Sequence, residues 1–145
     1  MIGLLQRVSE ASVTVDGDIV GQIGRGLLVL CCVQREDQEA NVKRLAERLA
    51  GYRVFEDESG RMNRSVSDVG GGLLLVPQFT LAADTRKGTR ASFSKAAPPE
   101  LGRAFFELLV AECRNQVDRV ETGRFGADMK VSLLNDGPVT FWLEA

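Results

Sequence analysis

Histidine is absent from this sequence of 145 residues. Its absence excludes Ser-His-Asp and Cys-His catalysis, and it removes histidine from any metal site or proton relay. Cysteine is scarce, and the three residues present, Cys31, Cys32 and Cys113, have no C-x-x-C spacing. An odd count without that spacing argues against a disulfide framework and against a zinc site. Any chemistry must therefore use hydroxyl groups, carboxylates, lysines, backbone dipoles or the substrate itself.

Long hydrophobic runs are absent too. No stretch of 18 apolar residues occurs, which argues against a membrane span, and Arg7 places a charge too early for a signal peptide. We therefore expect a cytoplasmic protein without a membrane partner. The formal net charge of −2 and the pI of about 5.3 are not typical of a protein that coats nucleic acid, and we expect no DNA partner. A local basic patch would still suffice to dock one RNA terminus.

The length of the chain and the lack of repeats or linkers indicate one domain over residues 1–145. Apolar residues spaced three and four apart predict two helices. The first contains Val42, Leu45, Ala46 and Leu49, with Asp37 as its N-cap and Gly51 at its end. The second begins near Pro98, and its expected apolar stripe is Leu101, Ala104, Phe105, Leu108 and Leu109.

Apolar and polar residues alternate in several short segments, which predicts strands. The expected strands are residues 2–8, 11–15, 19–23, 27–33, 52–55, 73–76, 129–134 and 139–143, with a hairpin turn at Asp16-Gly17. Cys31 and Cys32 are expected on opposite faces of their strand. Many strands and two helices without regular βαβ alternation indicate an α+β fold. We expect a mostly antiparallel, β-barrel-like sheet with two main helices packed outside.

Two segments differ from ordinary structural sequence. The first is Pro77-Gln-Phe-Thr-Leu81, which runs into Ala-Ala-Asp-Thr85, and the second is Asn135-Asp-Gly-Pro-Val-Thr140. From the residues alone, Gln78 and Thr80 are candidates for the solvent face of a strand whose Phe79 and Leu81 face the core. Residues 135–138 are all turn formers, and a plain turn is the corresponding structural explanation.

Together these segments resemble the two signature motifs of the D-aminoacyl-tRNA deacylase family. Further matching segments are residues 6–8, 51–55, 90–94 and 123–129, so the resemblance covers nearly the whole chain in order. It implies a homodimer with a β-barrel-like fold and no metal or organic cofactor. It also implies hydrolysis of the ester between a D-amino acid and the 3′ end of aminoacyl-tRNA. Members of the family also remove glycine from wrongly charged tRNA.

The resemblance assigns chiral selection to Gly137 and Pro138. In the family this Gly-Pro peptide bond is cis, and it reaches into the active site of the partner subunit. Its backbone carbonyl groups face the substrate and exclude an L side chain, and a main chain cannot rotate aside as a side chain can. Arg7 matches an arginine that braces this segment. The alternative for Arg7 is an ordinary surface position on the first strand.

Gln78, Phe79 and Thr80 match the catalytic wall of the family's pocket, where backbone N–H groups stabilise an oxyanion. Without histidine Thr80 has no evident base, so we expect it to position the substrate while water attacks with help from the terminal ribose 2′-hydroxyl. Phe79 and Met129 are expected to line the adenosine pocket, or to be core residues. Further expected contacts to the tRNA are Asn135, Lys87 and Arg90, although a basic loop at residues 86–95 can also be merely solvated.

Pro77 departs from the family motif, which usually begins with serine. Proline has neither the hydroxyl nor the backbone N–H, so the donors must come from Phe79, Thr80 or their neighbours. Its strand is expected to be locally edge-like or irregular. Three alternatives stay open at this point: a non-catalytic RNA-binding module, a hydrolase that removes L-amino acids, and a structural dimer in which the motifs are turns only.

Overall fold

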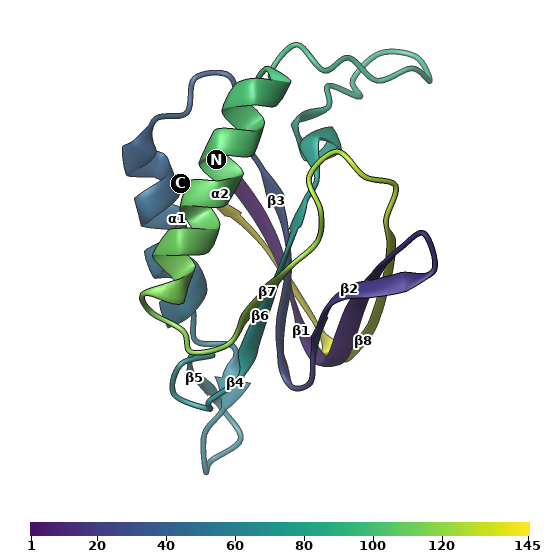
Figure 1. Ribbon diagram of the computed structural model, residues 1–145. Coiled ribbons are helices and arrows are strands. Elements are labelled where there is room, and N and C mark those ends of the chain that lie inside the picture. Colours follow the sequence, from purple (N-terminus) through teal and green to yellow (C-terminus); the bar gives the residue numbers. More distant parts are fainter.

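The computed structural model describes all residues 1–145 and consists of a six-stranded sheet, a two-stranded hairpin and two α-helices (Figure 1). The elements in chain order are β1 (Ile2–Val15), β2 (Asp18–Ile23), β3 (Gly26–Cys32), α1 (Glu39–Gly51), β4 (Phe55–Glu56), β5 (Met62–Arg64), β6 (Gly72–Pro77), the 3₁₀ helix η1 (Phe79–Ala82), α2 (Pro99–Arg114), β7 (Val120–Thr122) and β8 (Lys130–Glu144).

The sheet has the strand order β2-β1-β3-β6-β7, and β8 pairs with the other edge of β1. The pairs of β1 with β2, β3 and β8 are antiparallel, whereas β3–β6 and β6–β7 are parallel. The first half of β1 pairs with β3 and its second half pairs with β2, whereas β8 pairs with β1 along nearly its whole length. This change of partner curls the sheet into a nearly closed barrel. The α+β fold with a mostly antiparallel, barrel-like sheet is confirmed.

Both long strands were expected as two pieces each. β1 runs without interruption from Ile2 to Val15, and β8 runs through the Asn-Asp-Gly-Pro segment, which is therefore not a plain turn. The register between β1 and β8 shifts between Gln6 and Val8 and again between Val8 and Glu10. Such irregularities let a strand bend without ending, and local composition does not distinguish them from turns. The hairpin turn between β1 and β2 is confirmed, since Asp16 and Gly17 both have positive φ.

The two helices lie side by side on one face of the sheet (Figure 1). The expected apolar face of α1 is confirmed: Val42, Leu45, Ala46 and Leu49 are all buried. Its N-cap is Gln38 rather than Asp37. The Asp37 carboxylate instead accepts hydrogen bonds from the amino group of Met1 at 2.5 Å and from the N–H of Gln34 at 2.6 Å.

The second helix begins at Pro99, close to the expected position, but its buried face differs from the expected stripe. The buried residues are Gly102, Phe106, Leu109, Val110 and Cys113, and Ala104 is exposed. The reason is tertiary: α2 packs at once against α1, β3 and β7, and this turns the Phe106 row inward. Leu101, Phe105 and Leu108 lie at the border of that contact and are half-buried.

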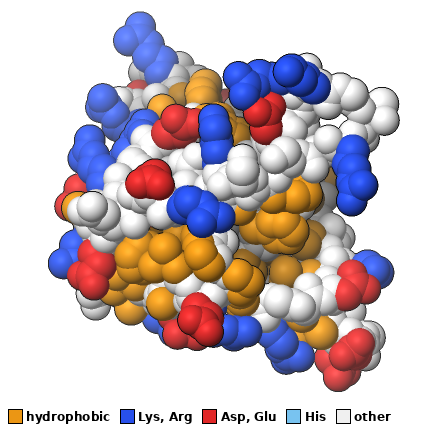
Figure 2. Space-filling view, turned by 90° about the horizontal axis from the view of Figure 1, so that it is seen from above, with side chains coloured by type: hydrophobic (Ala, Val, Ile, Leu, Met, Phe, Trp, Pro, Cys, Tyr) orange, Lys and Arg blue, Asp and Glu red, His pale blue; other side chains and the backbone are white.

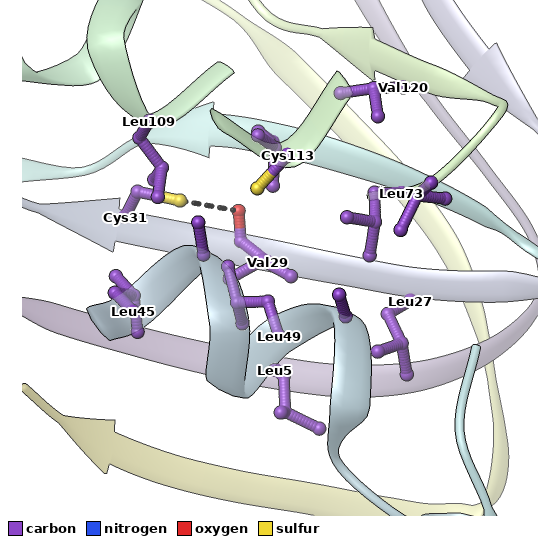
Figure 3. Packing of buried hydrophobic residues seen from close by; sticks show 14 of the residues in the cluster. Leu5, Leu27, Val29, Cys31, Leu45, Leu49, Leu73, Leu109, Cys113 and Val120 are labelled. Atoms are coloured by element: carbon purple, nitrogen blue, oxygen red, sulfur yellow. Dashed lines mark hydrogen bonds between the residues drawn. The ribbon is translucent and has the colours of Figure 1, made fainter. Parts of the chain in front are cut away.

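The main core contains 23 buried residues between the helices and the sheet. Figure 3 shows Leu45 and Leu49 of α1 and Leu109 and Cys113 of α2 meeting Leu27 and other sheet residues. A second cluster fills the barrel, and a third holds Ile2, Cys32, Ala82 and Ala96. Cys31 belongs to the first cluster and Cys32 to the third, so they lie on opposite faces of β3 as expected. Neither helix is long and apolar enough to cross a membrane.

Candidate functional site

A cavity of about 710 Å³ opens where β3 and β6 end, between the start of α2 and the loop that follows β7. Three of the expected site residues line it, namely Gln78, Phe79 and Met129, together with Pro77. Sequence reasoning missed three of its aromatic walls: Phe93, Phe106 and Phe125. Seen from above, the molecule has exposed hydrophobic patches bordered by charged side chains of both signs (Figure 2). The cavity is therefore mainly apolar, with polar groups near Gln78.

The chain leaves β6 at Pro77 and turns directly into η1 (Phe79–Ala82). This turn ends the two-residue alternation, so Phe79 does not face the core: 59% of its surface is exposed. Two contacts anchor the turn to the end of β3. The N–H of Gln78 donates to the carbonyl of Cys31 at 2.8 Å, and the thiol of Cys32 donates to the carbonyl of Phe79 at 3.5 Å.

Thr80 has one side-chain hydrogen-bond partner, since its hydroxyl accepts from Nε2 of Gln78. No carboxylate or lysine contacts this hydroxyl, so no group is placed to remove its proton. Phe79 and Thr80 are the first two residues of η1, and the first N–H groups of a helix have no acceptor within it. The arrangement therefore combines an unactivated hydroxyl with two available backbone donors.

Pro77 is tolerated because β7 is short. The N–H groups of a strand alternate in direction from one residue to the next. In β6 the N–H of Leu73 points toward the β7 side, where it donates to the carbonyl of Arg119, and the nitrogen of Pro77, four residues later, points to the same side. The pairing of β6 with β7 ends at Leu75, opposite Thr122. The nitrogen of Pro77 therefore faces a position where no partner strand remains. This confirms that the strand is locally edge-like at Pro77.

The cysteines contribute no nucleophile. Cys31 lines the cavity, but burial raises the pKa of its thiol well above the usual value. Burial also raises the pKa of Cys32, and it raises the pKa of Cys113 to about 12. A thiol attacks as its thiolate, so these side chains stay neutral and unreactive at ordinary pH. No set of three cysteine, aspartate or glutamate side chains converges into a group of metal ligands.

The Asn135–Thr140 segment lies within β8, and hydrogen bonds to Arg7 of β1 hold it in place. Arg7 is only 8% exposed, so it is not a surface residue. Its Nε donates to the carbonyl of Asp136 at 3.0 Å, and its Nη1 donates to the carbonyl of Val54 at 2.7 Å. Nδ2 of Asn135 donates to the carbonyls of Arg7 and Val139, each at 3.0 Å.

Gly137 and Pro138 themselves are exposed. The peptide bond between them is cis, as expected, and Gly137 has a φ of 136°, which favours glycine. Neither residue lines the cavity of its own chain. Lys87 and Arg90 are also absent from that cavity, but they line a smaller one of about 590 Å³ beside it. The structure thus brings Gln78, Phe79 and Met129 together and leaves the other expected residues around them.

Comparisons with known proteins identify the family. The family model described as D-Tyr-tRNA(Tyr) deacylase matches residues 4–144. A D-aminoacyl-tRNA deacylase of Alkalilimnicola ehrlichii is 68% identical over 100% of this chain and 97% of its own length. One of Vibrio cholerae is 61% identical over the full length of both chains.

Two solved structures share the fold. The c-Myc DNA unwinding element binding protein superposes with a TM-score of 0.95 at 38% identity, over 100% of this chain and 99% of its own. A probable eukaryotic D-amino acid tRNA deacylase superposes with a TM-score of 0.87 at 17% identity, over 99% and 98%. The second likeness establishes the fold alone.

The barrel, its cavity and these relatives define a hydrolase that cleaves the ester bond of aminoacyl-tRNA. The chain belongs to the D-Tyr-tRNA(Tyr) deacylase family, whose curated members are named D-aminoacyl-tRNA deacylases. Its activity is accordingly the deacylation of D-aminoacyl-tRNA.

Proposed function

We propose that the cavity binds the 3′-terminal adenosine of tRNA together with its aminoacyl ester. One observation carries this proposal: the cavity has aromatic and apolar walls, including Phe79 and Met129, and η1 begins at Phe79 with two N–H groups that have no acceptor within the helix. A base can stack or pack on the walls. The N–H groups of Phe79 and Thr80 can stabilise the negative charge that develops on the ester carbonyl oxygen. The N–H of Gln78 is already used by Cys31 and is no candidate.

Water is the proposed nucleophile, assisted by the terminal ribose 2′-hydroxyl of the substrate. Thr80 has no base to activate it, which supports a positioning role. Gln78 fixes the Thr80 hydroxyl as an acceptor, so the hydroxyl proton is free to point at the substrate or the water. Because an aminoacyl ester is already activated, orientation and oxyanion stabilisation supply the acceleration.

The proposed chiral filter is the Gly137–Pro138 backbone of a partner subunit. Both residues are exposed and neither lines the cavity of its own chain, which supports action on a neighbour. The hydrogen bonds from Arg7 and Asn135 support rigidity, because a main chain clamped beside the filter cannot yield to an L side chain. Asn135 then positions the filter. Glycine has no side chain to exclude, so the same site also accepts glycyl-tRNA.

A homodimer follows from this arrangement, and an uncovered face of the sheet supports it. Leu30, Leu4 and Trp142 are register partners across β3, β1 and β8. They lie on the face opposite Leu5, which packs against the helices. Leu4 and Leu30 are only half-buried and Trp142 is 48% exposed. An apolar row of this kind is typical of a surface that a second copy covers.

Lys87 and Arg90 are proposed to bind phosphates of the tRNA acceptor end. Both side chains are exposed, and neither forms an ion pair within the chain. Contacts of this kind orient the nucleic acid without reading its sequence.

The decisive experiment is hydrolysis of D-tyrosyl-, L-tyrosyl- and glycyl-tRNA in parallel, with and without the protein. We expect the D-tyrosyl and glycyl esters to be cleaved and the L-tyrosyl ester to be spared. Cleavage of none of the three would indicate a protein that binds aminoacyl-tRNA without deacylating it. Pro77→Ser, which introduces the usual residue of the family motif, would then be the first variant to assay. Cleavage of the L ester as well would show that the Gly137–Pro138 filter does not operate as argued.

A further inference from the structure

Two cavities of opposite character adjoin at the loop of residues 84–95. The smaller is lined by no hydrophobic side chain but by Asp84, Arg86, Lys87, Arg90 and Ser92. The larger is the proposed adenosine cavity, and Phe93 is one of its walls. Ser92 lines the smaller cavity and Phe93 lines the larger, so two consecutive residues connect the walls of the two cavities. Phe93 is therefore the residue of the larger cavity that follows the smaller one along this loop.

The loop is held in this shape by its own backbone. Asp84 and Ser92 exchange two hydrogen bonds, from the N–H of Asp84 at 2.7 Å and from the N–H of Ser92 at 3.0 Å. The residues in between, 85–91, therefore form a closed loop that ends immediately before Phe93. The basic residues therefore lie in a loop whose two ends are joined directly before Phe93.

The smaller cavity carries net positive charge. Nε and Nη2 of Arg86 donate to the carboxylate of Asp84 at 2.9 Å and 2.5 Å, and these hydrogen bonds hold the pKa of Asp84 well below its usual value. Asp84 thus stays ionised and neutralises Arg86. Lys87 and Arg90 have no carboxylate within ion-pair distance. Two uncompensated cations without apolar neighbours suit a phosphate group.

Phe93 is 40% exposed, and its ring meets that of Phe79 at a centroid distance of 5.1 Å and an angle of 62°. The edge-to-face contact leaves ring surface open at the mouth of the cavity. An exposed aromatic ring beside a cationic groove is the usual arrangement of a site for single-stranded nucleic acid, in which bases stack on the ring and cations follow the backbone.

We infer that Phe93 is a stacking platform for the base that precedes the terminal adenosine, and that Lys87 and Arg90 bind the phosphates on the 5′ side of that base. The inference rests on the proposed function, because it takes the larger cavity as the adenosine site. It adds a second nucleotide to the recognised substrate. The enzyme then contacts the last two nucleotides of the acceptor end rather than the terminal adenosine alone.

The test compares D-tyrosyl esters of adenosine and of the trinucleotide CCA, with kcat/KM as the readout. Wild type is expected to prefer the trinucleotide ester. Phe93→Ala should lower kcat/KM on the trinucleotide about 5- to 150-fold, the usual range for removal of one stacked base. It should lower kcat/KM on the adenosine ester by a clearly smaller factor, because Phe93 is only one of several walls of the adenosine cavity. Phe93→Tyr should keep kcat/KM on the trinucleotide ester close to that of wild type. Met62→Ala, at a similarly exposed apolar residue on β5, should leave kcat/KM unchanged on both esters.

Each outcome decides between the two proposals. If wild type cleaves both esters with equal kcat/KM, the second nucleotide site does not exist, although the proposed function stands. If Phe93→Ala lowers kcat/KM by the same factor on both esters, Phe93 supports Phe79 structurally and the inference is wrong. If wild type cleaves neither ester nor D-tyrosyl-tRNA, the proposed function fails and the inference fails with it.

The phosphate contacts are tested by salt. For single strands, the slope of log affinity against log salt concentration becomes shallower by about 0.7 for each phosphate that the protein no longer neutralises. Lys87→Ala and Arg90→Ala should each reduce the slope by about this amount for non-aminoacylated CCA with a 5′-terminal phosphate, which has two phosphates on the 5′ side of its middle base. The exposed Lys43→Ala on α1 is the matched control and should leave it unchanged. Unchanged slopes in both loop variants would overturn the assignment.

Discussion

At the residue scale, two buried side chains account for properties that surface chemistry would not reveal. Arg7 sits beneath β8 and donates to the carbonyls of Asp136 and Val54, which lie in different parts of the chain. Cys113 lies in the main core between α2 and the sheet. We expect Arg7 to couple stability to the proposed chiral selection, and Cys113 to couple stability to pH.

Arg7→Lys is expected to impair folding and chiral selection together. Lysine keeps the charge but cannot satisfy both carbonyls with the geometry of a guanidinium. A buried acceptor left unpaired costs about 1–3 kcal/mol. The free energy of unfolding should fall by about that amount, and the ratio of kcat/KM for D- over L-tyrosyl-tRNA should fall too. Arg53→Lys, an exposed arginine that contacts Asn63, is the control. Unaltered discrimination would separate Arg7 from the filter.

Cys113 should make the protein less stable at alkaline pH. Its pKa is about 12 in the folded protein, whereas an unfolded chain releases the proton near pH ~8.5. The thiol is neutral in both states below that pH, and above it ionisation favours only the unfolded chain. One such thiol lowers the free energy of unfolding by up to about 1.4 kcal/mol per pH unit.

Urea unfolding of wild type and Cys113→Ala between pH ~8 and ~10.5, a range that brackets ionisation of an unfolded thiol, tests this. The variant should be less stable at the lower end, because it leaves a cavity. Its stability should also fall less steeply with pH, although Cys31 keeps part of the slope because its pKa is raised in the same direction. Parallel curves for the two proteins would contradict the assignment to Cys113.

At the scale of elements, the short 3₁₀ helix η1 determines the chemistry of the site. Alternation along residues 75–81 favours a strand that buries Phe79, whereas the chain turns after Pro77 and exposes both Phe79 and Thr80. The turn is stabilised by distant contacts from Cys31 and Cys32 at the end of β3. A local pattern therefore could not predict which side chains reach the cavity.

Thr80→Ala is expected to lower kcat on D-tyrosyl-tRNA without abolishing it. Removal of one positioning hydrogen bond, worth about 0.5–1.5 kcal/mol, corresponds to about a 2- to 13-fold decrease. Single-turnover rates should fall by the same factor while substrate binding changes little. A complete loss of turnover with unchanged binding would instead identify Thr80 as the nucleophile.

At the scale of the whole molecule, the proposed active site requires two copies of the chain. Within one chain neither Gly137 nor Pro138 lines the cavity, and Trp142, next to the half-buried Leu4 and Leu30, is 48% exposed. Trp142→Arg should therefore produce a folded monomer with activity reduced more than about tenfold. Such a decrease corresponds to about 1.4 kcal/mol or more of transition-state stabilisation.

Met62→Arg provides a matched control, because Met62 is 50% exposed and lies on the β4–β5 hairpin, which is not part of the main sheet that contains β8 (Figure 1). Sedimentation should give a dimer for wild type and for Met62→Arg, and a monomer for Trp142→Arg. Circular dichroism should show all three to be folded. If the wild-type protein were a monomer with full activity, the Gly137–Pro138 segment of a partner subunit could not be the chiral filter.

Much of this protein is determined by its sequence alone. The lack of histidine excludes histidine-dependent catalysis, and the helical periodicity of residues 42–49 defines α1, because both depend on composition or on neighbours within one element. The two motifs, read with the segments around them, indicate the family. The cis bond between Gly137 and Pro138 and the edge-like position of Pro77 were also predicted correctly.

The tertiary structure alone decided where distant residues meet. It made β1 and β8 continuous, rotated the buried face of α2, and brought Phe93, Phe106 and Phe125 to one cavity. Phe93 and Phe125 lie in segments 90–94 and 123–129, which carried the family resemblance, but nothing local distinguished them from core aromatics. The order of strands and the packing of α2 depend on contacts far apart in the chain, and no periodicity within a single element encodes them.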